Sequence, residues 1–252
     1  MRLALAAAFL VLVASVNAGA TRPPVALIAS PSHVDLAGSA RSVVTVTNSG
    51  TETAVVDVLR AGYALDQRGR PRVAARRASW LAVVPSRLTL APRTSGSITV
   101  ASKLPRRAQP GDHPELVLFT THALPGRGLP VRVRLGVVVV VRAPGKVVHR
   151  LDLAGVHARR VRGRPILRLR FANRGNVIEA LRPACSRVVV WRGRVLLAML
   201  RPPGRRLLPR TSALVDVVYQ GTFRGDVRAR LSPVTGLHCP LAGRRRWFSV
   251  RL

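Results

Sequence analysis

The chain has 252 residues, and its 42 Lys or Arg against 10 Asp or Glu give a formal net charge of +32 at pH 7. This length can hold two domains of ordinary size, each with its own apolar core. Such a charge attracts polyanions, but aromatic residues make up only 4% of the chain and no recognition helix is visible. We therefore expect no nucleic acid among the partners.

An export signal is predicted over residues 1–20. Arg2 precedes an apolar run that ends at Val13, which is shorter than the about 20 residues that a spanning helix needs. Small residues at Ala18 and Ala20 offer cleavage sites. We expect the signal peptide to be removed and the mature chain, without a membrane span, to be secreted or held at the cell envelope.

Short β strands are predicted along the first half of the mature chain. Apolar residues alternate with polar ones or form short β-branched runs, and no segment keeps the 3.6-residue spacing of an amphipathic helix. Gly, Pro, Asn and Ser separate these segments at intervals typical of β-sandwiches. The predicted strands are 25–29, 42–47, 54–59, 80–84, 87–90, 96–101, 115–121 and 131–141.

Pro144 and Gly145 interrupt this pattern, which then resumes. The fold class predicted is all-β: two tandem Ig-like (Greek-key) β-sandwich modules, residues 21–143 and 147–252, after a cleaved signal peptide. The strands predicted in the second module are 147–153, 166–172, 187–191, 195–200, 213–219, 227–231 and 247–251.

Three turn motifs recur in the same order in both halves. Asn and Gly tolerate positive φ, and Pro before a polar turn starts the next strand, so these residues build turns in a shared fold. The pairs are Asn48 and Asn173 after a strand, Pro92–Ser95 and Pro209–Ser212 before a strand, and Gly111-Asp112 and Gly225-Asp226. The repeat predicts two related modules.

The chain has two cysteines, Cys185 and Cys239, both in the second module. An oxidising compartment outside the cytoplasm favours their pairing. We expect one disulfide; two separate buried thiols are the alternative.

Arginines cluster in predicted loops, where exposed guanidinium groups could bind phosphate-bearing polymers or anionic lipid headgroups. Lys103 and Lys146 are the two lysines among the 42 basic residues, as a GC-rich genome would produce, so a solvated surface without a ligand is the alternative. The possible polyanion-binding residues are Arg68, Arg70, Arg72, Arg76, Arg77, Arg106, Arg107, Arg244, Arg245 and Arg246.

The sequence gives no sign of catalysis. Its six histidines lack the spacing of metal ligands, and no nucleophile elbow or catalytic triad is recognisable. We expect no enzyme, no metal and no cofactor.

One stretch resembles a known family. Residues 79–92 hold a strand with Trp80, then Pro85, then an apolar-x-Leu-x-Pro turn, and a Pro-Gly-Asp-His turn follows at 110–113. This order resembles the peptidoglycan-binding domain of bacterial WxL-interacting cell-surface proteins, over residues 25–141. The resemblance implies a non-enzymatic envelope protein whose first module binds the cell wall or an anionic surface polymer and whose second module supports a protein contact.

A second family is similar in its organisation. Pilus chaperones are also exported, basic proteins of two Ig-like modules, although no matching arginine and lysine pair can be placed between the modules from this sequence. The alternative function is therefore a chaperone-like assembly factor for a surface or pilus-like protein, which holds a partner strand against an edge of the first module.

Overall fold

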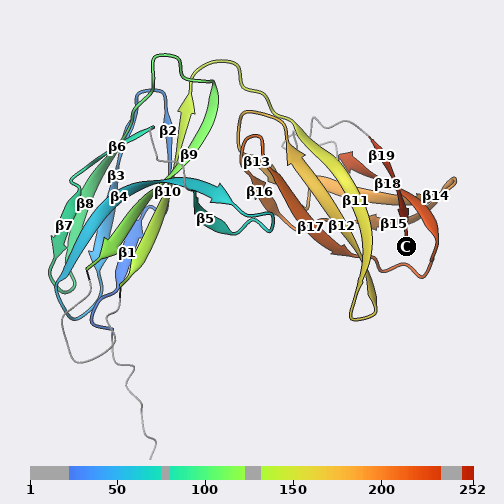
Figure 1. Ribbon diagram of the computed structural model, residues 1–252, viewed down its shortest axis with the longest axis horizontal. Helices are drawn as coiled ribbons and strands as arrows, with labels where there is room; N and C mark the ends of the chain where they lie inside the picture. Colours follow the sequence, from blue (N-terminus) through green and yellow to red (C-terminus); the bar gives the residue numbers. More distant parts are fainter. Residues whose placement is uncertain (1–22, 75–79, 123–131, 234–245) are drawn as a thin grey trace, which may run out of the picture.

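The computed structural model describes residues 23–74, 80–122, 132–233 and 246–252. Regular structure in these residues is entirely β, and the strands form two sandwiches (Figure 1). The predicted all-β fold of two Ig-like modules is confirmed. The signal peptide expected at 1–20 lies outside the described residues, and within them no helix is long and apolar enough to cross a bilayer.

The first module consists of two packed sheets. One has the order β1-β3-β8-β6; the other has the order β2-β10-β9-β4-β5, with β7 also paired to β4. The segments β1 and β2 follow each other but belong to different sheets, and β2 runs parallel to β10. The strands are β1 (Leu27–Ser30), β2 (His33–Ala37), β3 (Arg41–Asn48), β4 (Ala54–Leu65), β5 (Pro71–Ala74), β6 (Leu81–Val84), β7 (Arg87–Leu90), β8 (Ser95–Ser102), β9 (Gly111–Thr121) and β10 (Arg134–Ala143).

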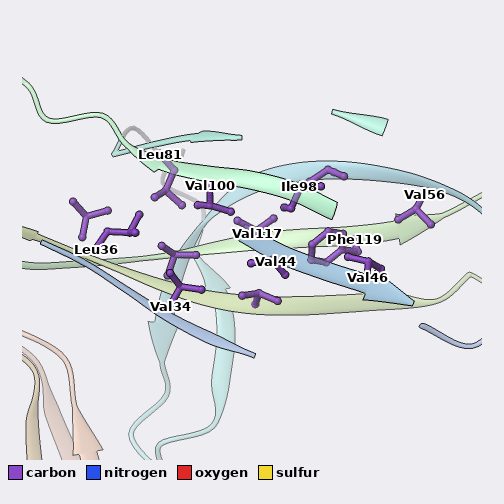
Figure 2. Close-up of a cluster of buried hydrophobic side chains, with 14 of the residues drawn as sticks. Val34, Leu36, Val44, Val46, Val56, Leu81, Ile98, Val100, Val117 and Phe119 are labelled. Carbon is purple, nitrogen blue, oxygen red and sulfur yellow. The ribbon is translucent and has the colours of Figure 1, made fainter. Parts of the chain in front are cut away.

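The core of the first module fills the space between its sheets (Figure 2). Val44 and Val46 of β3 point inward because side chains alternate along a strand, and they meet Val117 and Phe119 from the facing sheet. β9 lies in the middle of its sheet and is buried on both faces along most of its length. Apolar side chains therefore also occur on the outer face of this sheet, away from the core.

The second module repeats the sandwich with a separate core, which includes Leu169, Phe171, Val190 and Val215. Its sheets have the orders β11-β12-β17 and β15-β14-β18-β19, and β13 pairs with β16. The strands are β11 (Leu151–Val161), β12 (Arg164–Asn173), β13 (Glu179–Leu181), β14 (Ser186–Arg192), β15 (Val195–Leu200), β16 (Arg205–Leu207), β17 (Ser212–Val218), β18 (Asp226–Pro233) and β19 (Trp247–Arg251).

The first repeated motif is built around a buried asparagine at the end of β3. Asn48 Nδ2 donates to the carbonyl oxygens of Glu52 (2.7 Å) and Leu90 (3.1 Å), and Asn48 Oδ1 accepts from Gly50 N at 3.0 Å. One side chain thus satisfies backbone groups from two separate turns.

Asn173, at the end of β12, makes the same set of bonds. Its Nδ2 donates to the carbonyl oxygens of Val177 (2.7 Å) and Leu207 (3.2 Å), and its Oδ1 accepts from Gly175 N at 2.9 Å. The equivalence of the two halves expected from the sequence is confirmed at this motif.

The other two motifs also match in geometry. Arg93 and Arg210 both adopt positive φ, 60° and 58°, within the Pro-Arg-Thr-Ser turns, and Gly111 and Gly225 have φ of 117° and 126°. The same residue types therefore form the same turns in both modules.

The strand predictions miss several short elements. β2, β5, β13 and β16 are edge or bridging strands of three to five residues, and their short segments carry too little alternation to stand out. β4 extends to Leu65, beyond the predicted end at residue 59, because β5 and β9 pair with this continuation.

Cys185 is buried just before β14. Cys239 lies outside the described residues, so the disulfide between the two stays a prediction.

Candidate partner-binding surface

The first half of β10 forms an open sheet edge. β2 pairs with β10 only from Val138 to Arg142. Among the described residues no strand pairs with Arg134–Val137 on that side, whereas β9 pairs with them on the other. An unpaired edge of this kind is a template for another strand.

The backbone of β10 shows which groups face this edge. Thr121 N donates to Val133 O at 3.0 Å, so Val133 faces β9, whereas Val138 N donates to Ser32 O at 3.1 Å on the opposite side. Because these groups alternate between the two sides of a strand, Arg134 and Gly136 direct their N–H and C=O toward the open edge.

Apolar side chains cover the outer face of the sheet beside this edge. Leu116 and Leu118 of β9 are buried without belonging to the module core. In register, Gly136 lies opposite Leu118, which lies opposite Leu59 on β4, and Leu59 is 49% exposed. A Cβ at Gly136 would lie 3.5 Å from Leu118 Cδ2, so the glycine leaves a shallow space at the edge. The combined feature, called here the β10 site, is a free strand edge next to an apolar face.

Asp57 forms a polar cluster at the outer end of the same sheet. Its carboxylate accepts from Arg87 Nε at 2.8 Å and lies 2.7 Å from His122 Nε2. The hydrogen bond from Arg87 lowers the pKa of Asp57, so the carboxylate is charged at neutral pH. The apolar face therefore ends at a charged border.

The modules meet at a junction centred on Asp112, at the start of β9. Its carboxylate, which is buried, accepts from Arg142 Nε at 2.6 Å and from Ile178 N at 2.7 Å. Asp112 N donates to Asn176 O at 2.8 Å, and Asn176 Nδ2 donates to Pro110 O at 2.9 Å. Charge-assisted bonds of this kind fix the approach of the two modules.

A second contact joins the modules through the turn between β4 and β5, residues 66–70, called here the strap. Figure 1 shows this hairpin extending toward the second module. Leu214 N donates to Gln67 O at 2.7 Å, and Arg205 Nη1 donates to Arg68 O. Because β17 is an edge strand of its sheet, the strap closes part of that edge.

The strap is held in shape by Asp66. Asp66 Oδ1 accepts from Arg70 N at 2.9 Å and from Arg68 N at 2.8 Å, and these bonds lower the pKa of Asp66. Arg72 Nη2 lies 3.6 Å from Asp66 Oδ2. The three predicted polyanion-binding arginines in this region thus belong to, or follow, a structural turn.

A cavity of about 700 Å³ lies between the junction and the strap. Trp80 and His113 stack in its wall with ring centroids 3.7 Å apart, and Glu115 accepts from Trp80 N at 3.1 Å. Burial raises the pKa of Tyr63, another residue of the wall.

Three of the remaining predicted arginines lie in the described part of the chain. Arg106 and Arg107 lie between β8 and β9, and Arg107 reaches the rim of the cavity. Arg246 precedes β19 in the second module, with its guanidinium 5.9 Å from the Phe248 ring centroid. Four candidates lie outside the described residues: Arg76, Arg77, Arg244 and Arg245. A single polyanion site at these arginines therefore stays a prediction.

Neither a protein-family model nor a curated protein matches this sequence. Solved structures share its fold. The class 5 fimbriae chaperone CfaA is 15% identical with a TM-score of 0.50, and the match covers 90% of this chain and 98% of that one. A structure of the chaperone–tip adhesin complex of CFA/I fimbriae matches over the same shares, at 13% identity and a TM-score of 0.50. At these identities the likeness is one of fold.

The predicted resemblance to WxL-interacting proteins is wrong. The predicted binding of peptidoglycan or the cell wall, which depended on that resemblance, is wrong as well. The two solved structures described above match over both modules and come from fimbrial chaperone studies, which fits the second resemblance instead. The residues behind the error have structural roles: Trp80 packs against His113, and the turn after Leu90 recurs after Leu207 in the second module.

Proposed function

We propose that this chain is a chaperone-like assembly factor that holds a β strand of an exported surface protein at the β10 site. The observation that carries the proposal is the open edge at Arg134–Val137 beside the apolar face of Leu116 and Leu118. Strand addition to a free sheet edge gives affinity through main-chain hydrogen bonds and specificity through alternate side chains.

Each part of the site has a role in such binding. Arg134 and Gly136 provide N–H donors and C=O acceptors for the incoming strand. Since Gly136 has no side chain, the partner residue beside it gains room to pack against Leu118. The partner therefore places a bulky apolar side chain at this position.

The proposal includes the setting of the protein. The signal peptide at 1–20 exports the chain, module 1 (21–143) carries the β10 site, and module 2 (147–252) is held against it by the junction and the strap. The activity is binding, without catalysis or a cofactor. The fold that the chain shares with fimbrial chaperones, one of them solved with a tip adhesin, supports the same role.

The test uses the one backbone donor that can be removed cleanly. Gly136→Pro deletes an N–H that faces the open edge and leaves the bonds to β9 in place, since proline is tolerated on edge strands. Gly136→Ala is the matched control, because its methyl group reaches Leu118 only at ordinary contact distance and the N–H remains.

A photoreactive residue at Arg134 first captures the partner in the host, and the purified partner is then titrated into each variant. We expect Gly136→Pro to weaken binding about tenfold or more and Gly136→Ala to change it less than about threefold. Equal affinity for both variants, with unchanged circular dichroism, would mean that the partner does not pair with β10.

A further inference from the structure

The sheet β15-β14-β18-β19 of the second module presents a row of aligned side chains on its outer face. Val189 lies opposite Met199 on one side and Arg230 on the other, and Arg230 lies opposite Trp247. Residues directly opposite each other in adjacent strands share a face. The neighbouring Val190 belongs to the core, so this row points away from it.

The row combines exposed apolar groups with arginines. Met199 is 48% exposed and Trp247 is 38% exposed. The guanidinium carbons of Arg230 and Arg228 lie 4.5 and 5.3 Å from the centroid of the Trp247 ring, as in cation–π pairs. Arg187 Nη1 lies 3.5 Å from Met199 Sδ. Trp, Arg and Met are the residue types enriched in the centres of protein interfaces.

The charge on this face has one sign over most of its area. The positive charge comes from Arg187 on β14 and from Arg228 and Arg230 on β18. On these four strands, the acidic residue on the same face is Asp226, which lies opposite Arg251 at one end. The face therefore complements a negatively charged surface.

Two donors on this face lack acceptors. Trp191 Nε1 and Arg230 Nε are buried without a hydrogen-bond partner among the described residues. Trp191 lies opposite Arg228, so both donors belong to the same face. A buried donor left unpaired is unfavourable, but both atoms are closed to solvent, so an acceptor from another molecule could reach them only after side chains on this face shift.

We propose that this face is a second docking surface, specific for an acidic protein partner. A second copy of the chain does not fit, because two faces with the same arginines would repel each other at a net charge of +32. Figure 1 places β14, β15, β18 and β19 on the side of the second module away from the first. The chain can thus hold a partner at the β10 site and an acidic protein here at the same time.

A crosslinking experiment locates this partner. A photoreactive amino acid replaces Met199 in the full chain, expressed in the native host. The matched control replaces Val161, another exposed apolar residue of the second module, at the end of β11. We expect an adduct with an acidic protein at position 199 and not at 161. No adduct at 199, the same adducts at both positions, or an adduct with a second copy of the chain overturns the proposal.

The identified protein is then titrated into two charge-matched double variants. Arg228→Glu with Arg230→Glu alters the face, and Arg160→Glu with Arg164→Glu makes the same charge change at exposed positions on β11 and β12. We expect the first pair to weaken binding about 30-fold or more and the second less than about threefold. Equal losses in the two pairs overturn the proposal.

Two further variants separate this surface from a failure to fold and from the β10 site. Arg228→Lys with Arg230→Lys keeps the charge but loses the planar stacking on Trp247, and an intermediate affinity is expected. Gly136→Pro leaves binding of the acidic protein unchanged; a parallel loss would show that both partners use one surface and would overturn the proposal.

Discussion

The two modules build the same turns but finish their sheet edges differently. In the second module the edge strand β17 is partly closed, since Leu214 N donates to Gln67 of the strap. In the first module β2 covers only part of β10 and leaves Arg134–Val137 open. Exposed edges promote association and are usually protected. The edge left open beside an apolar face is therefore the more informative one.

The two Gly-Asp motifs also differ in their surroundings, although their turns are alike. Asp112 and Asp226 follow glycines of similar φ, yet Asp112 is buried against Arg142 and Ile178, whereas Asp226 is exposed. The motif sets the backbone, and the neighbouring module decides whether its side chain forms a contact.

The largest expected effect tests whether the modules are equivalent. Asn48→Ala and Asn173→Ala each leave several buried backbone groups unpaired, and each should lower the free energy of unfolding of its own module by about 3 kcal/mol. Urea unfolding gives the loss, and hydrogen exchange followed by mass spectrometry shows which module opens. A loss below about 1 kcal/mol at one site would break the equivalence.

Substitutions at the two Gly-Asp motifs should differ in their effect on stability, because Asp112 lies at the junction and Asp226 does not. Asp112→Asn removes a buried charge from a pair with Arg142, and we expect a loss of about 2 kcal/mol. Asp226→Asn, at an exposed position, should stay within about 0.5 kcal/mol. Thermal unfolding of both variants measures the difference, and similar losses would mean that Asp112 does not fix the junction.

The strap can be tested with two glycines of nearly equal φ. Gly69 has φ 75° and Gly163 has φ 74°, so alanine at either should cost about 1 kcal/mol through backbone strain. A Cβ at Gly69 would lie 2.6 Å from Arg205 Nη1, whereas a Cβ at Gly163 would have none of the measured neighbours within 4 Å. Gly69→Ala should therefore displace the Arg205 side chain and lower the free energy of unfolding more than Gly163→Ala does, as urea unfolding measures. Equal losses would show that the contact of Arg205 with the strap adds no stability.

The smallest expected effect concerns acid stability. Hydrogen bonds from Arg168 and Arg159 lower the pKa of Asp216 below its ordinary value of 3.8. The charged carboxylate of Asp216 therefore contributes fully to the free energy of unfolding above pH 3.8. This contribution is lost as the pH falls through the lower pKa of the folded state. Asp216→Asn should remove less than about 1 kcal/mol at neutral pH, since the group is partly exposed, and progressively less as the pH is lowered below 3.8. Unfolding measured across this pH range checks the sign.

Much of the fold could be predicted because its signals are local. Asn48, Asn173 and the Pro-Arg-Thr-Ser turns mark strand ends through their own conformational preferences, and alternation marks the strands between them. β2 escaped prediction because its pairing partner, β10, is distant in sequence, and β5 because its four residues carry too little alternation.

The candidate site was harder to predict for a different reason. An open edge is the absence of a neighbour, and no residue pattern records it. The alternation of Val133, Arg134 and Leu135 predicted a strand but could not tell an edge from an interior position. Net charge pointed to the arginine clusters as candidate sites, but Arg68, Arg70 and Arg72 lie at the strap of the first module, whereas Arg246 lies in the second.

The junction and the strap together limit how the modules can move. Two bodies attached at two separate points keep one rigid-body freedom, a rotation about the line through those points. Here that line runs from Asn176 to Gln67. A force on a strand held at β10 would therefore act as a torque about this axis, and the hydrogen bonds at Asn176 and Gln67 would carry the load.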